Sequence, residues 1–383
     1  MNSSAVAQWD ADRVVEDVRR LGGRGLPLAE LHRQIGARLR RALPFDAACW
    51  HGLDPDTLLL TTANPEELIA NGFLNTDSEP RAAQAVLASE YLRPDVNAFA
   101  ALARRRSPVG VLSQSTRGRP QHSARYREFL AKCGTPHELR AVFVTRQRAW
   151  GCVVIHRSER SGDFGDSDVR LMAELSGPIA DALRQSVRLS AARGGDDPRA
   201  PGLVILGPRN EPELITATAE QLLEDLRSLS PATRQIMPIP VLTTAEAVRT
   251  ARQSRTVHIA SASGWISLHA SLPDGGHSQR VAVVVQRAAP EQTASLRLEA
   301  LGLTAREREI AELVARGHST QQISERLFLS PWTVQDHLKA IFDKTGVRSR
   351  RQLLATIFFS EQLPSLLAGA PLDAHGHLRH LEN

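Results

Sequence analysis

Apolar residues between positions 304 and 361 recur with the period of short α-helices. Val334, Leu338 and Ile341 follow one another at intervals of four and three residues, which predicts a buried stripe on one helix. That helix would contain about 15 residues and be roughly 22 Å long at the usual rise per residue. The polar residues between these positions would face solvent. The pattern therefore predicts a small helical bundle in which one helix presents a polar surface.

Each of the four helices predicted in this region begins with its own start signal. Ser330 precedes Pro331, a favoured pair for the N-cap and the first helical position. Gly317 and Gly346 are expected to end the first and third helices in a left-handed conformation. The other three helices begin with capping boxes, in which a hydroxyl residue is followed three positions later by Glu or Gln: Thr304 with Glu307, Ser319 with Gln322, and Ser349 with Gln352.

The long segment before this bundle, residues 10–190, combines the periods of helices and strands. Its apolar positions predict a mixed α/β domain with a central hairpin. In chain order the expected elements are two amphipathic helices (through Val14, Val18 and Leu21, then Leu28 to Leu43), strands at 47–52 and 57–62, a hairpin of 139–145 with 150–156, and a helix with Val169, Met172, Ile179 and Leu183 on one face.

A second α/β pattern covers residues 202–289. It consists of two strands, a helical stretch and three further strands, the last two joined by a Pro-Asp-Gly-Gly turn. The expected strands are 202–206, 213–216, 256–260, 265–271 and 280–286, with a helix at 219–226. His258 and His269 fall on predicted strands, where a haem ligand is one reading and an ordinary structural or exposed histidine the more common one.

The boundaries between these blocks follow from composition. Residues 191–201 contain Gly, Pro and charged residues without apolar periodicity, so a linker is expected there, and a weaker break lies near 289–293. The chain of 383 residues is long enough for several cores. The predicted organisation is an α+β multidomain protein with domains at 10–190, 202–289 and 298–362, then a disordered tail at 363–383.

Charge and cysteine content limit the class of protein further. The net charge is only +5, so non-specific DNA affinity would come from a local basic cluster rather than from the whole chain. Three cysteines without a C-x-x-C motif argue against a disulfide framework or a cysteine zinc site, and Cys49 and Cys152 are expected to be buried packing residues. The chain lacks a run of 18 apolar residues and a signal-peptide core, which predicts a cytoplasmic protein without a membrane partner.

The C-terminal motif resembles the LuxR-type helix-turn-helix. The resemblance is carried by Leu303-Thr-Ala-Arg-Glu-Arg-Glu309, Val314-Ala-Arg-Gly317, Thr333-Val334 and Lys344-Thr-Gly-Val-Arg-Ser-Arg350, and it covers about 60 residues. It implies a third helix that enters the major groove of double-stranded DNA and a fourth helix that joins two copies of the domain.

The resemblance also implies roles for individual residues. Gln335, Asp336 and Lys339 would contact base edges or nearby phosphates, and the seam of a homodimer would contain Leu353, Leu354, Ile357 and Phe358. Many family members carry Lys or Arg in place of Gln335, and Asp336 adds a negative charge, which indicates an altered base preference or weaker binding. Backbone and phosphate contacts are expected from Thr320, Ser330, Thr333, Lys344, Arg348 and Arg350.

The upstream blocks resemble sensory modules. The helix pair, hairpins and exit helix of residues 10–190 are similar in architecture to a GAF domain, an α/β module with a six-stranded antiparallel sheet. The succession of elements in 202–289 resembles a PAS fold. Both resemblances imply a small-molecule effector or a signalling partner for these blocks, but no residue for a cofactor can be identified, so no cofactor is expected.

Catalytic motifs are absent from the sequence. There is no G-x-x-x-x-G-K-[ST], H-E-x-x-H or G-x-S-x-G motif, and Asp54 lies before Pro55 in a turn rather than in a phosphorylation site. His375, His377 and His380 lie in the Gly/Pro/His tail, where a disordered segment is expected rather than a metal site. An enzyme is therefore not expected.

Three functions are consistent with these observations. The first is a one-component transcription regulator, in which sensory domains control a DNA-binding head and RNA polymerase is a further candidate partner. The second is a sigma-like factor, which would require a promoter-melting helical domain upstream; only 4% of the residues are aromatic. The third is a signalling or protein-interaction module whose head binds DNA weakly.

Overall fold

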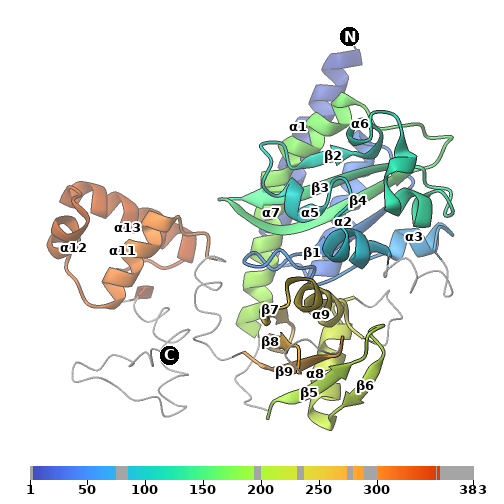
Figure 1. Cartoon of the computed structure of the whole chain (residues 1–383). Helices are drawn as coiled ribbons and strands as arrows, with labels where there is room; N and C mark the ends of the chain where they lie inside the picture. The colour runs from blue at the N-terminus through green and yellow to red at the C-terminus, as the bar shows by residue number, and fades with distance from the viewer. Residues whose placement is uncertain are drawn as a thin grey trace. The chain divides into compact units, whose positions relative to one another are not determined.

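The computed structural model describes residues 3–74, 85–193, 200–230, 237–273, 279–288, 301–350 and 352–353. The chain forms two units, Met1–Arg287 and Ala288–Asn383 (Figure 1). The first unit contains two lobes. The first lobe is defined here as residues 3–193 and the second lobe as residues 200–287. Within the described residues, no helix has the length and apolar character required to cross a membrane.

A four-stranded antiparallel sheet organises the first lobe. Its strands are β1 (Ala47–Gly52), β2 (Val109–Val111), β3 (His137–Thr145) and β4 (Arg148–Arg157), in the order β1-β4-β3-β2. The β3–β4 hairpin turns at Arg146 and Gln147, whose φ values are 51° and 66°. Two left-handed residues at this position match the twist of the strands that they join, so the predicted central hairpin is confirmed.

Three long helices accompany this sheet. They are α1 (Ser3–Gly22), α2 (Leu28–Ala42) and α7 (Asp166–Arg193), and α7 contacts α1, α2 and β3 (Figure 1). The apolar stripe of α2, including Leu31, Ile35 and Leu39, is buried as its period predicts. The shorter segments are α3 (Glu66–Ala70), α5 (Phe99–Leu102), α6 (Leu112–Ser115), the 3₁₀ turn η2 (Pro120–His122) and the π-helical turns η1 (Ala88–Leu92) and η3 (Tyr126–Leu130).

The second lobe contains a five-stranded antiparallel sheet. Its strands are β5 (Gly202–Leu206), β6 (Pro212–Ile215), β7 (Arg255–Ser261), β8 (Gly264–Ser271) and β9 (Val281–Arg287), in the order β6-β5-β9-β8-β7. Val281, Val283 and Val285 alternate with less buried residues, which is the period of a strand with one face on the core. The helices of this lobe are α8 (Ala217–Arg227) and α9 (Ile239–Ala251).

Most of the predicted elements are confirmed, and one predicted strand is wrong. Residues 57–62 do not form a strand: they make one isolated bridge, between Leu60 and Leu53, and Leu58 is left-handed with a φ of 60°. The carboxylate of Asp54 accepts hydrogen bonds from the backbone N–H and hydroxyl of Thr57 at 2.7 and 2.8 Å, which holds this segment as a turn. The predicted linker at 191–201 begins inside α7, which continues to Arg193.

Helix α9 is missing from the sequence prediction for a physical reason. Residues Ile239 to Glu246 are all buried, so the helix has no exposed polar stripe over its first two turns. It also begins with prolines at positions 238 and 240, which resemble a loop in sequence but are tolerated in the first turn of a helix. The described part of the first lobe likewise contains β2 and the short helices, which the sequence pattern does not locate.

The two lobes share a buried interface that involves α9. Its first residue, Ile239, belongs to the core of the first lobe, whereas Leu59 and Leu87 belong to the core of the second. The hydroxyl of Thr243 donates to the carbonyl of Leu60 at 2.9 Å, and the N–H of Ala63 donates to the hydroxyl of Ser230 at 3.0 Å. Because apolar residues of each lobe complete the core of the other, the lobes form one packed body.

Thr243 and Thr244 offer a matched test of this interface. Both are fully buried, and both donate to the carbonyl of Pro240 within α9, but only Thr243 also bonds to Leu60 of the first lobe. We expect Thr243→Val to lower the free energy of unfolding of the first unit by about 1–3 kcal/mol more than Thr244→Val, because a buried carbonyl loses a partner. Urea unfolding of the full-length variants measures the difference, and equal losses would show that the bond between the lobes adds nothing.

Candidate nucleic-acid interface

Three helices of the second unit begin at residues with complete or partial capping. They are α11 (Ala305–Ala315), α12 (Thr320–Leu327) and α13 (Pro331–Thr345) (Figure 1). In α11, the N–H of Glu307 donates to the hydroxyl of Thr304 at 3.2 Å, and the N–H of Thr304 donates to the Glu307 carboxylate at 2.6 Å. Ser319 and Gln322 make the same reciprocal bonds in α12, so both capping boxes are confirmed.

The third predicted capping box differs from the first two. Ser349 accepts from the N–H of Gln352 at 3.2 Å, but the Gln352 side chain accepts from the N–H of Arg348 at 2.7 Å instead of from Ser349. At α13, Ser330 accepts from the N–H of Thr333 at 3.0 Å, and Gly346 ends the helix with a φ of 72°. The first and last residues of each helix are therefore determined by neighbours in the sequence, which explains why the helices of this domain could be predicted.

The polar face of α13 is the candidate surface for DNA. Val334 and Ile341 are fully buried and Leu338 is 5% exposed, so the predicted stripe is confirmed. Gln335, Asp336 and Lys339, which we expect at the base edges, are all exposed. The candidate backbone contacts Thr320 and Thr333 are half-buried at the starts of α12 and α13, and Ser330 is exposed. These side chains lie on the first turns of two neighbouring helices or on the outer face of α13.

The basic cluster at the end of α13 is less available than its sequence suggests. The ammonium group of Lys344 forms an ion pair with the carboxylate of Glu307, and the guanidinium of Arg350 donates to the backbone carbonyl of His318. Both side chains are half-buried, whereas Arg348 is exposed. Two of the three cations assigned to phosphate are therefore engaged within the domain: Lys344 joins α13 to α11, and Arg350 bonds to the loop between α11 and α12.

Glu307 acts at two contacts. Burial tends to raise the pKa of its carboxyl, but hydrogen bonds from Lys344 and Thr304 and the charge of Lys344 outweigh burial and lower the pKa below its usual value. The same carboxylate completes the capping box of α11 and neutralises the lysine of α13. It thereby joins the start of α11 to the last turn of α13, the helix that carries the polar face.

Two large aromatic residues on this domain are exposed. Trp332 is 76% exposed on the first turn of α13, as its position predicts. Phe328 is 95% exposed in a left-handed conformation at the C-terminus of α12, with a φ of 53°. An apolar residue in the run Leu327-Phe-Leu329 would ordinarily be assigned to the core, so the sequence pattern does not predict that Phe328 is exposed. Phe328 is exposed because it caps the C-terminus of α12 in a left-handed conformation.

The residues assigned to a dimer seam divide into two groups. Leu353 is fully buried in the core of the domain, where it packs with Val334 and Ile341, so its side chain stabilises the single domain. Leu354, Ile357 and Phe358 lie outside the described residues, as does the tail with His375, His377 and His380.

Comparison with known proteins assigns the domain to a family. Residues 301–357 match the model of bacterial regulatory proteins of the luxR family. The spore germination protein GerE of Bacillus subtilis is 38% identical over 55 residues, which are 74% of that protein and 14% of this chain. The chain therefore belongs, through its C-terminal domain, to the luxR family of bacterial regulatory proteins.

Another relative matches a similarly short part of the chain. A putative HTH-type transcriptional regulator of Mycobacterium bovis is 48% identical over 52 residues, which are 14% of this chain and 6% of that protein. The chain thus spans a small fraction of the mycobacterial relative. A solved structure described as the phage VqmA-DPO complex covers 45% of this chain with 15% identity and a TM-score of 0.24, a similarity too low to assign a fold.

The Glu307–Lys344 pair predicts a specific response to pH. Glu307→Gln keeps an acceptor for the capping box but removes the ion pair, so the free energy of local unfolding of α11 and α13 should fall by about 1.5–3 kcal/mol at pH 7. Because the folded pKa is lowered, this stabilisation is complete above the unfolded pKa of Glu and is lost as the pH falls toward the folded value. Hydrogen–deuterium exchange of the full-length protein at several pH values measures both effects.

Glu312→Gln is the control for this experiment, because Glu312 is an exposed residue of α11 and lies 4.0 Å from Arg316. It should leave the exchange of both helices nearly unchanged. A loss that is the same for the two variants, or independent of pH, would contradict the assigned role of Glu307.

Proposed function

We propose that this protein is a sequence-specific DNA-binding transcription regulator whose first unit controls the binding of the second. The observation that carries the proposal is the luxR-family domain at residues 301–357, in which α13 presents Gln335, Asp336 and Lys339 on an exposed face. A helix of this length can lie in a major groove about 12 Å wide, where base edges are distinguishable. Relatives that share the domain are described as transcriptional regulators.

The proposed contacts differ in what they recognise. Gln335 can pair with adenine and Asp336 can accept from cytosine, whereas Lys339 can donate to guanine. Arg348, Ser330, Thr320 and Thr333 would hold the DNA backbone and thereby set the position of α13. Lys344 and Arg350, which are held by Glu307 and by His318, would contribute mainly by keeping the helices in place.

The proposal extends to the first unit. Its first lobe would act as the GAF-like and its second as the PAS-like sensory module. The succession of two strands, two helices and three strands in the second lobe supports the latter. Binding of an effector would change how two copies of the head are paired on DNA, which needs a difference in affinity of only a few kcal/mol between the two arrangements. A homodimer, RNA polymerase as a partner and a cytoplasmic location belong to the same proposal.

The decisive experiment is capture of genomic DNA fragments by the purified full-length protein at low and moderate salt. Recovery of a short palindromic sequence that survives moderate salt would support a dimeric, sequence-specific regulator, and its neighbouring genes would indicate the signal. Recovery of only salt-sensitive fragments without a common sequence would contradict sequence-specific binding.

Two substitutions separate base recognition from backbone contact. Lys339→Ala should weaken binding to the recovered sequence by about 1–3 kcal/mol and have little effect on unrelated DNA. Arg348→Ala should weaken binding to all sequences alike and lower the salt slope by about one unit. Titrations over a range of salt concentrations measure both, with Lys132→Ala in the first unit as the control. If both variants bind like the unaltered protein, α13 does not occupy the groove as proposed.

One alternative has support from particular residues. Asp336 brings a negative charge to the groove, and Phe328 and Trp332 expose apolar rings, features that also suit a protein-interaction head with weak DNA binding. Gln335→Lys distinguishes the two: conversion of a non-binder into a sequence-specific binder would favour the interaction module. The sigma-like reading lacks its required helical domain, because the described residues of the first unit form two antiparallel sheets.

A further inference from the structure

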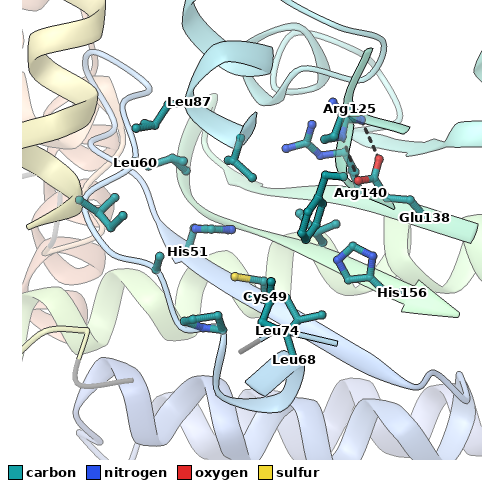
Figure 2. A pocket seen from close by; sticks show the side chains of 16 residues that line it. Cys49, His51, Leu60, Leu68, Leu74, Leu87, Arg125, Glu138, Arg140 and His156 are labelled. Atoms are coloured by element: carbon teal, nitrogen blue, oxygen red, sulfur yellow. Dashed lines mark hydrogen bonds and ion pairs between the residues drawn. The ribbon is translucent and has the colours of Figure 1, made fainter. Parts of the chain in front are cut away.

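A cavity of about 80 Å³ lies in the first lobe. Figure 2 shows Leu60 and Leu87 on one side of it, Arg125, Glu138, Arg140 and His156 on the opposite side, and Leu68 and Leu74 between them near Cys49. Since an engineered apolar cavity of about 150 Å³ binds benzene, a cavity of about 80 Å³ has room for a molecule smaller than benzene. It therefore has the size for a small ligand and two chemically different walls.

The polar wall belongs to a network of buried charges. Arg125 donates to both oxygens of Glu138, at 3.0 and 2.7 Å, and Arg140 lies 2.6 Å from Glu90. Burial would raise the pKa of Glu138, but the charges of Arg125 and Arg140 and the bonds from Arg125 outweigh it and lower the pKa to about 2. These two arginines and two glutamates thus balance in charge. Asp95, 3.8 Å from Arg125, adds a further negative charge nearby.

The Arg140 guanidinium has hydrogen-bond donors to spare. Its side chain is 1% exposed, and it stacks over the ring of Phe99 with 3.8 Å between Cζ and the ring centroid. Its Nη2 forms the ion pair with Glu90, whereas Nε and Nη1 have no hydrogen-bond partner in the described part of the chain. Buried N–H groups almost always have a partner. Nδ1 of His156, on the same wall, also has none among the described residues.

These features define the chemistry of a ligand. The unpaired N–H groups of Arg140 would bind a hydrogen-bond acceptor of the ligand. The leucines that line the cavity would contact an apolar part of the ligand. A carboxylate would add another anion to a network whose cations are already balanced, at a cost in desolvation. An ammonium group has only hydrogen-bond donors, so it could not pair with the N–H groups of Arg140. Burial lowers the pKa of His51 and of His156 to about 4, so both rings are neutral at pH 7 and supply no further cation.

One residue of the second lobe forms part of the cavity wall. Ile239, the first residue of α9, lines the cavity together with Leu60 and Ala63. The latter two are bonded through their backbones to Thr243 and Ser230 of the second lobe. A molecule in the cavity would therefore touch the residues that join the lobes, so its presence could be transmitted to α9.

We infer that this cavity is a binding site for a small, uncharged, amphipathic molecule, with a carbonyl-type acceptor at Arg140 and an apolar chain among Leu60, Leu68, Leu74 and Leu87. Occupancy stabilises the contact of α9 with the first lobe. Its use as a regulatory signal rests on the proposed function, whereas binding itself does not.

Three probes of similar size test the inference on the full-length protein without DNA: 2-butanone, propanoate and propylammonium at pH 7.5. Isothermal titration calorimetry and the thermal unfolding midpoint give the affinity and the stabilisation. We expect 2-butanone to raise the midpoint in a saturable manner and to bind at least tenfold more tightly than either ion. No saturable effect of the ketone, or equal effects of all three probes, would overturn the inference, because water alone or non-specific apolar contact would then account for the cavity.

Matched variants locate the site. Ala63→Leu should fill the cavity and abolish the effect of the ketone, and Ala101→Leu, the same change at an exposed position, should not. The double variant Glu90→Gln with Arg140→Met removes a donor and its counter-charge together and keeps an acceptor for the N–H of Phe99. It should fold, as circular dichroism can verify, and bind the ketone at least tenfold more weakly. Unchanged binding in Ala63→Leu or in the folded double variant would place the ligand elsewhere.

Because none of these measurements contains DNA, their failure leaves the proposed function intact. Addition of 2-butanone to the DNA-binding titration then measures regulation, which is meaningful only if the recovered sequence binds.

Discussion

The balance of buried charge around Arg140 is the constraint on which the first lobe depends. Its members come from separate segments: Glu90 from η1, Arg125 from the residue before η3, and Glu138 and Arg140 from β3. Removal of an ion from water costs several kcal/mol, and a partner offsets this only when the geometry is held closely. The described segments that carry Glu90 and Arg125 must therefore be held in one arrangement against β3. The cavity beside Arg140 is a consequence of that arrangement.

A second buried carboxylate connects the two lobes. Asp54 accepts from the backbone of Asp56 and Thr57 and, at 3.3 Å, from the N–H of His258 in β7. Burial raises the pKa of Asp54 even though these bonds act in the other direction. The residue thus holds a turn of the first lobe against a strand of the second. Thr243 and Ser230 make two further hydrogen bonds between the lobes.

The second unit is held together by local capping bonds and by a few bonds between residues that are distant in sequence. Each helix begins at a hydroxyl residue, so the lengths of α11, α12 and α13 are set by neighbours in sequence. Their angles depend on contacts that join distant positions, such as Glu307 with Lys344 and Arg306 with the carbonyl of Leu327. In the proposed complex with DNA, cations that serve such contacts would keep only part of their capacity for phosphate, and the phosphate contacts would fall mainly on the exposed Arg348 and the N-terminal turns.

The sequence by itself determined the elements whose causes are local. The caps of α11, α12 and α13, the β3–β4 hairpin, the amphipathic helix α2 and all five strands of the second lobe follow from periodicity and turn residues within short windows. The burial of Cys49 and Cys152 also follows from their apolar neighbours.

Only the tertiary structure decided the features that depend on contacts between residues distant in sequence. The segment 57–62 has the composition of a strand, but the Asp54 carboxylate and the second lobe hold it as a turn. Helix α9 has no amphipathic period because both lobes cover it, and Lys344 and Arg350 resemble phosphate ligands until Glu307 and His318 are brought beside them. The cavity needs residues from Cys49 to Ile239, and no short window of sequence contains them. Burial and pairing between distant residues are properties of the folded chain, so periodicity cannot report them.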